Sequence, residues 1–149
     1  MGLLQFRIEG RADVEKLTSA PIIGDIPLAE EGNGKAGGIA VRENENSLMA
    51  ETFRGIRTNL QFMLGEENKV ILVTSTISGE GKTFVATNLA ISLSLLGKRV
   101  VIVGLDIRKP GLNKVFNLSQ KEKGITQFLA GPQTTDLMSM VQPPGYPAP

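Results

Sequence analysis

The apolar residues between Ser47 and Leu64 recur at alternating steps of four and three. They are Met49, Phe53, Ile56, Leu60 and Met63. This spacing places them on one face of a helix. Gly65 follows directly, and glycine commonly ends a helix. We therefore predict an amphipathic helix over residues 47–64.

Two later segments, "KVILVTS" (69–75) and "RVVIVGL" (99–105), are continuous apolar runs rich in β-branched residues. Such runs are typical of parallel strands covered on both faces. Residues 82–96 between them have a helical pattern that stops at Gly97. Strand, helix and strand within about 35 residues form a βαβ unit with a right-handed crossover. We therefore predict an α/β fold with a doubly wound, mostly parallel sheet.

The chain divides into three parts by composition. Residues 1–28 are a lead-in, with a short helix opened by Asp13 and a strand at 22–26. Residues 29–46 are rich in glycine and charge, which predicts a mobile connector. Residues 47–149 form the main unit, in which "GITQFLAG" (124–131) is a short helix and the terminal "QPPGYPAP" is too rich in proline to order independently.

Charge and composition exclude several classes of function. Sixteen basic and fifteen acidic residues leave a net charge of +1, so no general attraction to nucleic acid is expected. The sequence has no cysteine and no histidine, which excludes disulfides, thiolate sites and a Ser-His-Asp triad built from this chain alone. No apolar run reaches the ~20 residues of a spanning helix, and no secretory signal is present. We expect a chain that stays in the cytoplasm.

A glycine-rich loop joins the first predicted strand to the helix after it. Its sequence "TISGEGKT" meets the phosphate-loop pattern G-x-x-x-x-G-K-[ST] except at the opening glycine, where Thr76 stands. Unpaired N–H groups and the helix dipole converge at such a junction and favour an anion. The residues expected to bind nucleotide are Ser78, Gly79, Glu80, Gly81, Lys82, Thr83 and Phe84.

Within this loop, Lys82 is expected to reach the β- and γ-phosphates, and the Thr83 hydroxyl to bind Mg²⁺. The plainer alternative is a strand-to-helix turn with a solvated lysine. Flanking strand and helix patterns favour the nucleotide.

Asp106 follows the second predicted strand, in "VVIVGLDIRKPGL". The carboxyl ends of strands in doubly wound sheets face the ligand crevice, so Asp106 should lie near the phosphate loop. A carboxylate there can hold Mg²⁺ or accept a proton from an attacking hydroxyl. We therefore predict Lys82 and Asp106 as catalytic residues, with Thr83 and Asp106 as metal ligands. The alternative is a turn aspartate paired with Arg108.

Taken together, "STISGEGKT", "VGLDIRKPGL" and "ETFRGIRTNLQFM" resemble the cytoplasmic domain of bacterial tyrosine kinases of the capsular and exopolysaccharide family. The resemblance implies a P-loop NTPase-type domain that binds ATP and Mg²⁺ and phosphorylates protein tyrosines. The family's D-x-D-x-R motif is matched from Gly104 to Arg108, so its first acidic position is glycine and Asp106 is the single candidate in this segment. ATP rather than GTP rests on the resemblance, and the guanine-binding pattern N-K-x-D is not found.

The family's E-x-x-R-x-x-R helix is matched by Glu51, Arg54 and Arg57. The resemblance implies that they contact a neighbouring subunit in a ring. An intrahelical pair of Glu51 with Arg54 on a solvated face is the alternative. The implied partners are further copies of the chain and a membrane-embedded regulator of polysaccharide chain length, at the inner face of the plasma membrane. No nucleic-acid partner is expected.

Two parts of the family pattern are not found. There is no later apolar strand ending in aspartate, and Tyr146 is the only tyrosine. The chain therefore resembles a kinase domain truncated at its C-terminus, with an incomplete sheet that would expose an apolar edge.

Two other functions stay open. One is a P-loop ATPase switch of the partition or division-site type, against which Ile77 stands where those proteins have a second lysine. The other is a non-catalytic partner that binds nucleotide in order to assemble.

Overall fold

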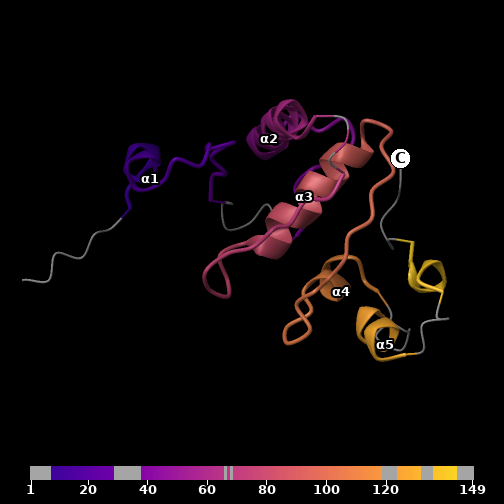
Figure 1. The fold of residues 1–149 in the computed structure, drawn as a ribbon. Coiled ribbons are helices and arrows are strands. Elements are labelled where there is room, and N and C mark those ends of the chain that lie inside the picture. The colour runs from indigo at the N-terminus through magenta and orange to yellow at the C-terminus, as the bar shows by residue number, and fades with distance from the viewer. Residues whose placement is uncertain are drawn as a thin grey trace, which may run out of the picture.

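The computed structural model describes residues 8–28, 38–65, 67, 69–118, 124–131 and 136–143 (Figure 1). The elements in order are α1 (Arg11–Leu17), α2 (Leu48–Leu64), α3 (Lys82–Ser94), α4 (Leu112–Val115), α5 (Ile125–Ala130) and the 3₁₀-helix η1 (Met138–Met140). None of these helices combines the length and apolar character needed to cross a membrane, over the residues described.

The hydrophobic core lies between α2 and α3, which are neighbours in Figure 1. Its buried members are Val41, Phe53, Ile56 and Leu89. The ring of Phe53 packs edge-on against that of Phe84, with centroids 5.8 Å apart. An aromatic pair of this geometry contributes roughly 0.5–1.5 kcal/mol beyond the area that it buries. Packing on α2 therefore helps to fix the helix that follows the glycine loop.

The predicted helices are confirmed, except that α1 begins at Arg11 after Gly10 and is not opened by Asp13, and α3 ends two residues early, at Ser94. The hydroxyl of Ser47 accepts a hydrogen bond from Ala50 N at the start of α2, and Gly65, at φ +63°, ends that helix. α3 leads into a turn at Gly97, which has φ +73°. α5 lies between two glycines, as expected. α4 and η1 were not predicted, because elements of three or four residues are too short to show a period.

The prediction of strands at 22–26, 69–75 and 99–105 is wrong for this structure, because the described residues contain no strand. A strand exists only when a neighbour supplies its ladder hydrogen bonds, and these segments do not pair with one another. Most apolar side chains of 69–75 and 99–105 face solvent instead, with Val70 89% and Val101 66% exposed. The doubly wound sheet is thus not formed here.

The lead-in segment at 22–26 packs against α2 instead of pairing as a strand. Ile23 and Ile26 contact the core cluster, and Asn59 Nδ2 donates to the Ile23 carbonyl at 2.8 Å. A Cβ atom on Gly24 would clash with the side chain of Ile56. A glycine is needed at this position because the backbone approaches α2 so closely.

Residues 38–41, which we name the strap, are tied to α3 by one buried amide. Asn88 Oδ1 accepts from Ala40 N at 2.7 Å and from Val41 N at 3.0 Å. Its Nδ2 donates to the carbonyls of Gly38 and Phe84. Residues 29–37 of the expected connector lie outside the described residues, whereas the strap belongs to the packed body. The domain boundaries themselves stay a prediction.

We expect Asn88→Leu to lower the free energy of unfolding by about 3 kcal/mol or more, because it leaves buried N–H and C=O groups of the strap without partners. Urea unfolding followed by circular dichroism measures the loss. Asn59→Leu is the matched control, since it also removes an amide-to-backbone bond but at an exposed site. Equal, small losses in the two variants would show that the strap does not stabilise the fold.

Candidate functional site

The glycine-rich loop has a left-handed backbone at two of its glycines. Gly79 and Gly81 have φ of +97° and +95°, in the region that L-residues avoid. A Cβ atom at either position would meet nothing within 4 Å. Glycine is therefore required here by conformation and not by space, and the loop can curve ahead of the helix.

The loop leads directly into α3, whose first residue is Lys82. Gly81 precedes it and offers no side chain to cap the helix. The first N–H groups of a helix have no acceptor within it, and they carry the positive end of the helix dipole. The start of α3 is consequently an electropositive site open to an anion.

An anion already lies in the loop, supplied by the loop itself. The carboxylate of Glu80 accepts a hydrogen bond from Ile77 N at 3.1 Å and from the Thr76 hydroxyl at 3.0 and 3.1 Å. The bond from Ile77 N is the main reason that the pKa of Glu80 falls below its ordinary value of 4.5, and the neighbouring hydroxyls add to the effect. The donors of this loop therefore stabilise a negatively charged oxygen.

The ammonium group of Lys82 is folded back onto the same loop. Its Nζ donates to Ser75 Oγ at 2.9 Å and to the Ile77 carbonyl at 3.0 Å. These are neutral acceptors, and a phosphate would be a stronger one because it is charged. Binding of a phosphate would require Lys82 to exchange these bonds for bonds to the ligand.

Two other predicted binding residues contribute differently. Ser78 is exposed at the tip of the loop. The ring of Phe84 packs on Phe53 in the core, so Phe84 offers a ligand only its backbone N–H. The side chain of Phe84 instead anchors the start of α3 to α2.

Asp106 lies in a turn that its own side chain stabilises by a hydrogen bond. Its Oδ1 accepts from Lys109 N at 3.0 Å, and Gly104 lies against the side chain of Leu112. The alternative expectation, an ion pair of Asp106 with Arg108, is not found among the described residues. Five residues beyond Asp106, the turn reaches α3, where Gly111 contacts Thr83.

The described residues contain no group of three or more acidic, histidine or cysteine side chains able to hold a metal ion. The candidate donors are the Thr83 hydroxyl and the Asp106 carboxylate, whose turn reaches α3 at Gly111. Such a set suits Mg²⁺ bound partly through a nucleotide and water. Metal binding by these residues alone is thus not expected.

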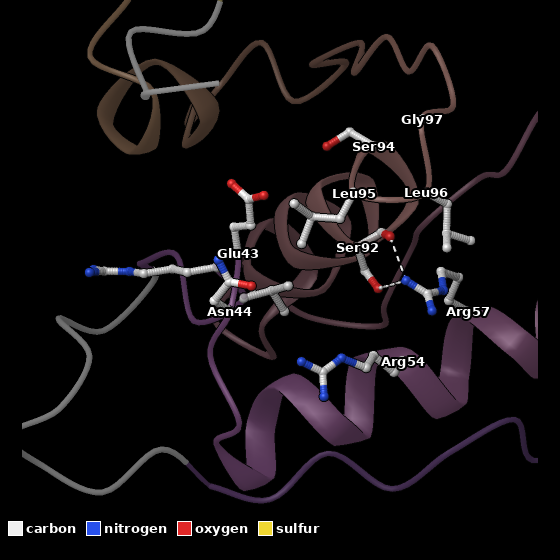
Figure 2. Close-up of a pocket in the computed structure, with 11 residues that line it drawn as sticks. Glu43, Asn44, Arg54, Arg57, Ser92, Ser94, Leu95, Leu96 and Gly97 are labelled. Atoms are coloured by element: carbon white, nitrogen blue, oxygen red, sulfur yellow. Dashed lines mark hydrogen bonds between the residues drawn. The ribbon is translucent and has the colours of Figure 1, made fainter. Parts of the chain in front are cut away.

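Glu51, Arg54 and Arg57 lie in α2 and take part in contacts within the chain. Arg54 pairs with Glu51 and donates to the Glu45 carbonyl. Arg57 Nη1 donates to the carbonyl of Ser92 at 2.8 Å and to its hydroxyl at 3.3 Å (Figure 2). Ser92 lies in the last turn of α3, where a cation also interacts favourably with the helix dipole. Local spacing could not predict this bond because 35 residues separate its partners.

A cavity of about 510 Å³ lies beside Arg54 and Arg57, lined also by residues 41–44, by Ser92 and by residues 94–97 (Figure 2). It is at the end of α3 opposite the glycine loop, and none of the residues from Ser75 to Phe84 lines it. The negative end of the α3 dipole lies at this cavity, which disfavours a phosphate, and Arg54 and Arg57 are already bonded to oxygens of the chain. The loop therefore remains the better candidate for a phosphate site than this cavity.

A left-handed glycine loop that opens a packed helix with a lysine at its first position is the arrangement of P-loop nucleotide-binding proteins. A family model, ParA, described as an NUBPL iron-transfer P-loop NTPase, matches residues 66–142. The chain belongs to this family of P-loop NTPases. The match supports the P-loop NTPase fold, although the sheet is not formed in the described residues. The iron-transfer activity of the family's description is not carried over, since this sequence has no cysteine, the usual ligand of iron–sulfur clusters.

The chain is also similar to tyrosine-protein kinases. It is 40% identical over 81 residues to tyrosine-protein kinase CpsD of Streptococcus agalactiae, covering 54% of this chain and 35% of that one. It is 38% identical over 84 residues to tyrosine-protein kinase YwqD of Bacillus subtilis, covering 56% and 35%. It is 35% identical over 95 residues to tyrosine-protein kinase ptk of Acinetobacter johnsonii, covering 63% and 13%. The predicted resemblance is confirmed, and the matched part spans about a third or less of each relative.

The lowered pKa of Glu80 generates a prediction. Because the pKa lies below its ordinary value in the folded chain, the bonds of the carboxylate to the loop are complete above pH 4.5 and are lost as the pH falls through the folded pKa. We expect Thr76→Val to raise the pKa of Glu80 toward the ordinary value, because it removes the hydroxyl that donates to the carboxylate. A carboxyl ¹³C NMR titration measures the shift.

The control for that titration is Thr74→Val, which removes a hydroxyl that is not bonded to Glu80. It should leave the titration unchanged. A Glu80 carboxyl that titrates at or above its ordinary value in the unsubstituted protein would contradict the hydrogen bonding described here.

Proposed function

We propose that this chain is the ATP- and Mg²⁺-binding part of a bacterial protein-tyrosine autokinase that regulates the length and export of a polysaccharide. Membership of the P-loop NTPase family implies nucleotide binding. The names of the relatives favour protein tyrosine as the phosphoryl acceptor. Since the chain spans only a fraction of those relatives, the activity is proposed for the whole protein to which such a part belongs.

The observation that carries the proposal is the carboxylate of Glu80 held in the loop. The N–H of Ile77 and the hydroxyl of Thr76 donate to a negatively charged oxygen, and the side chain of Lys82 lies on the same loop. A nucleotide phosphate presents oxygens of the same charge to these donors. It would displace the carboxylate, which is exposed and free to turn to solvent.

Each residue then has a role that its position allows. Bound Mg²⁺–ATP supplies the phosphoryl group to be transferred. Lys82 neutralises negative charge on the β- and γ-phosphates, and the amides at the start of α3 hold their oxygens. The hydroxyl of Thr83 and the carboxylate of Asp106 would hold Mg²⁺ when the nucleotide is bound. Glycine at position 104 leaves Asp106 as the single carboxylate of its motif.

We also propose that Glu51, Arg54 and Arg57 contact a second copy of the chain, in a ring at the inner face of the plasma membrane beside a membrane-embedded chain-length regulator. Support comes from exposure, since the side chains of Glu51 and Arg54 are 59% and 35% exposed. Arg57 is bonded to α3, so it would connect such an interface to the helix of the nucleotide site.

A P-loop ATPase switch of the partition type is a second candidate, favoured by the ParA family match. Ile77 in place of that class's second lysine argues against it. Phosphotyrosine formed on a tyrosine-rich peptide by the whole protein would separate the two, because the switch hydrolyses ATP without phosphorylating protein.

We expect Lys82→Met to weaken ATP binding by about ten-fold or more, since a charge-assisted hydrogen bond contributes roughly 1.5–3 kcal/mol. Titration of a fluorescent ATP analogue in the presence of Mg²⁺ measures the affinity, and a rise in melting temperature with ligand gives a second measurement. Lys98→Met, at an exposed turn after α3, is the matched control. If ATP binds to neither the unsubstituted chain nor the control, the nucleotide site is wrong.

Asp106→Ala should remove the gain in ATP affinity that Mg²⁺ provides, because the metal loses its carboxylate. The affinity measured in EDTA should not change. Asp136→Ala is the control, since Asp136 also accepts a backbone N–H in its own turn. If Mg²⁺ still raises the ATP affinity of Asp106→Ala, Asp106 is not a metal ligand and serves only to close its own turn.

A further inference from the structure

Gly111 lies directly against Thr83 at the start of α3. A Cβ atom on Gly111 would be 2.9 Å from Thr83 Oγ1 and 3.2 Å from Thr83 Cγ2. Nonbonded heavy atoms are in optimal contact at about 3.5–4 Å. Any side chain at position 111 would therefore have to displace Thr83 or the turn that carries it.

The backbone of Gly111 does not itself require glycine. Its φ of −75° and ψ of −31° lie in the right-handed helical region that every residue adopts. Gly79 and Gly81 are the opposite case, with positive φ and open space around them. Glycine at position 111 is thus explained by the space that it leaves free beside Thr83.

That space lies where the turn of Asp106 meets the phosphate-loop helix. Asp106 and Lys109 close the tip of the turn, and Gly104 contacts Leu112 across its base. Gly111 is next to this base and touches α3. How closely the turn approaches Thr83 therefore depends on the size of residue 111.

We propose that Gly111 is a positioning residue of the magnesium site, where the missing side chain lets the Asp106 turn lie against α3 without moving the Thr83 hydroxyl. The inference rests on the proposed nucleotide function and adds a residue to it. Mg²⁺ demands near-ideal octahedral geometry, with ligands at about 2.0–2.1 Å. Threonine is also stiff about χ1, so a displaced hydroxyl cannot easily turn back.

The test compares binding of a fluorescent ATP analogue with Mg²⁺ and with EDTA. We expect Gly111→Ala to lower the affinity measured with Mg²⁺ by about ten-fold, the usual size of the effect when a group that orients a ligand is changed. The affinity in EDTA should stay unchanged, because the amides and Lys82 are not affected. A merely structural role would lower both affinities together.

A second substitution tests the steric cause. Thr83→Ser keeps the hydroxyl and removes the Cγ2 that hinders its rotation, so Gly111→Ala combined with Thr83→Ser should regain most of the magnesium-dependent affinity. Gly55→Ala is the matched control, since Gly55 lies in α2 and a Cβ atom there meets nothing within 4 Å. Circular dichroism melting shows whether each variant remains folded.

The outcomes separate the two ideas. If the unsubstituted chain does not bind the analogue, the proposed nucleotide function fails, and this inference fails with it. If it binds but Gly111→Ala retains the full magnesium effect, loses affinity equally in EDTA, or is not rescued by Thr83→Ser, only the role of Gly111 is overturned.

Discussion

The buried amide of Asn88 is the interaction on which the described structure depends most. Because the described residues form no sheet beneath it, α3 needs other contacts to fix its position, and Asn88 supplies three hydrogen bonds to the strap at its centre. Phe84 packs on Phe53 near the start of the helix, and Arg57 binds the carbonyl of Ser92 near its end. The phosphate loop thus precedes a helix that is held along its whole length, which orients the amides of the first turn.

The loop at the start of that helix satisfies its own charges without a ligand. Glu80 occupies donors that a phosphate oxygen would use, and Lys82 binds neutral oxygens of the same loop. Both contacts are exposed and join residues only three to five positions apart. A ligand could therefore replace them without any movement of α2 or α3. Positive φ at Gly79 and Gly81 is already present. Most of the cost of ordering the loop is therefore met before a nucleotide arrives.

What the sequence predicted well was local. The helical period of Phe53 and Ile56 and the end of α2 at Gly65 are set by neighbours within a few residues, and these predictions were confirmed. Three features could not be predicted, namely the strap on Asn88, the bond from Arg57 to Ser92 and the contact of Gly111 with Thr83. Each joins residues that are 28 or more positions apart, and no local pattern encodes such a pairing. The resemblance to tyrosine kinases was found because its motifs are short and contiguous.

The unpaired segments at 69–75 and 99–105 follow from the same distinction. A parallel sheet forms only when strands distant in sequence pair and are covered on both faces, whereas α3 needs only its own hydrogen bonds and one packed face. Val70 and Val101 are therefore exposed although their residue types favour burial, and burying a side chain of this size stabilises a fold by roughly 1.5–3 kcal/mol. Because these two segments do not bury their apolar side chains, they do not help to position the candidate nucleotide site. Contacts of α3 with α2, the strap and Arg57 position it instead.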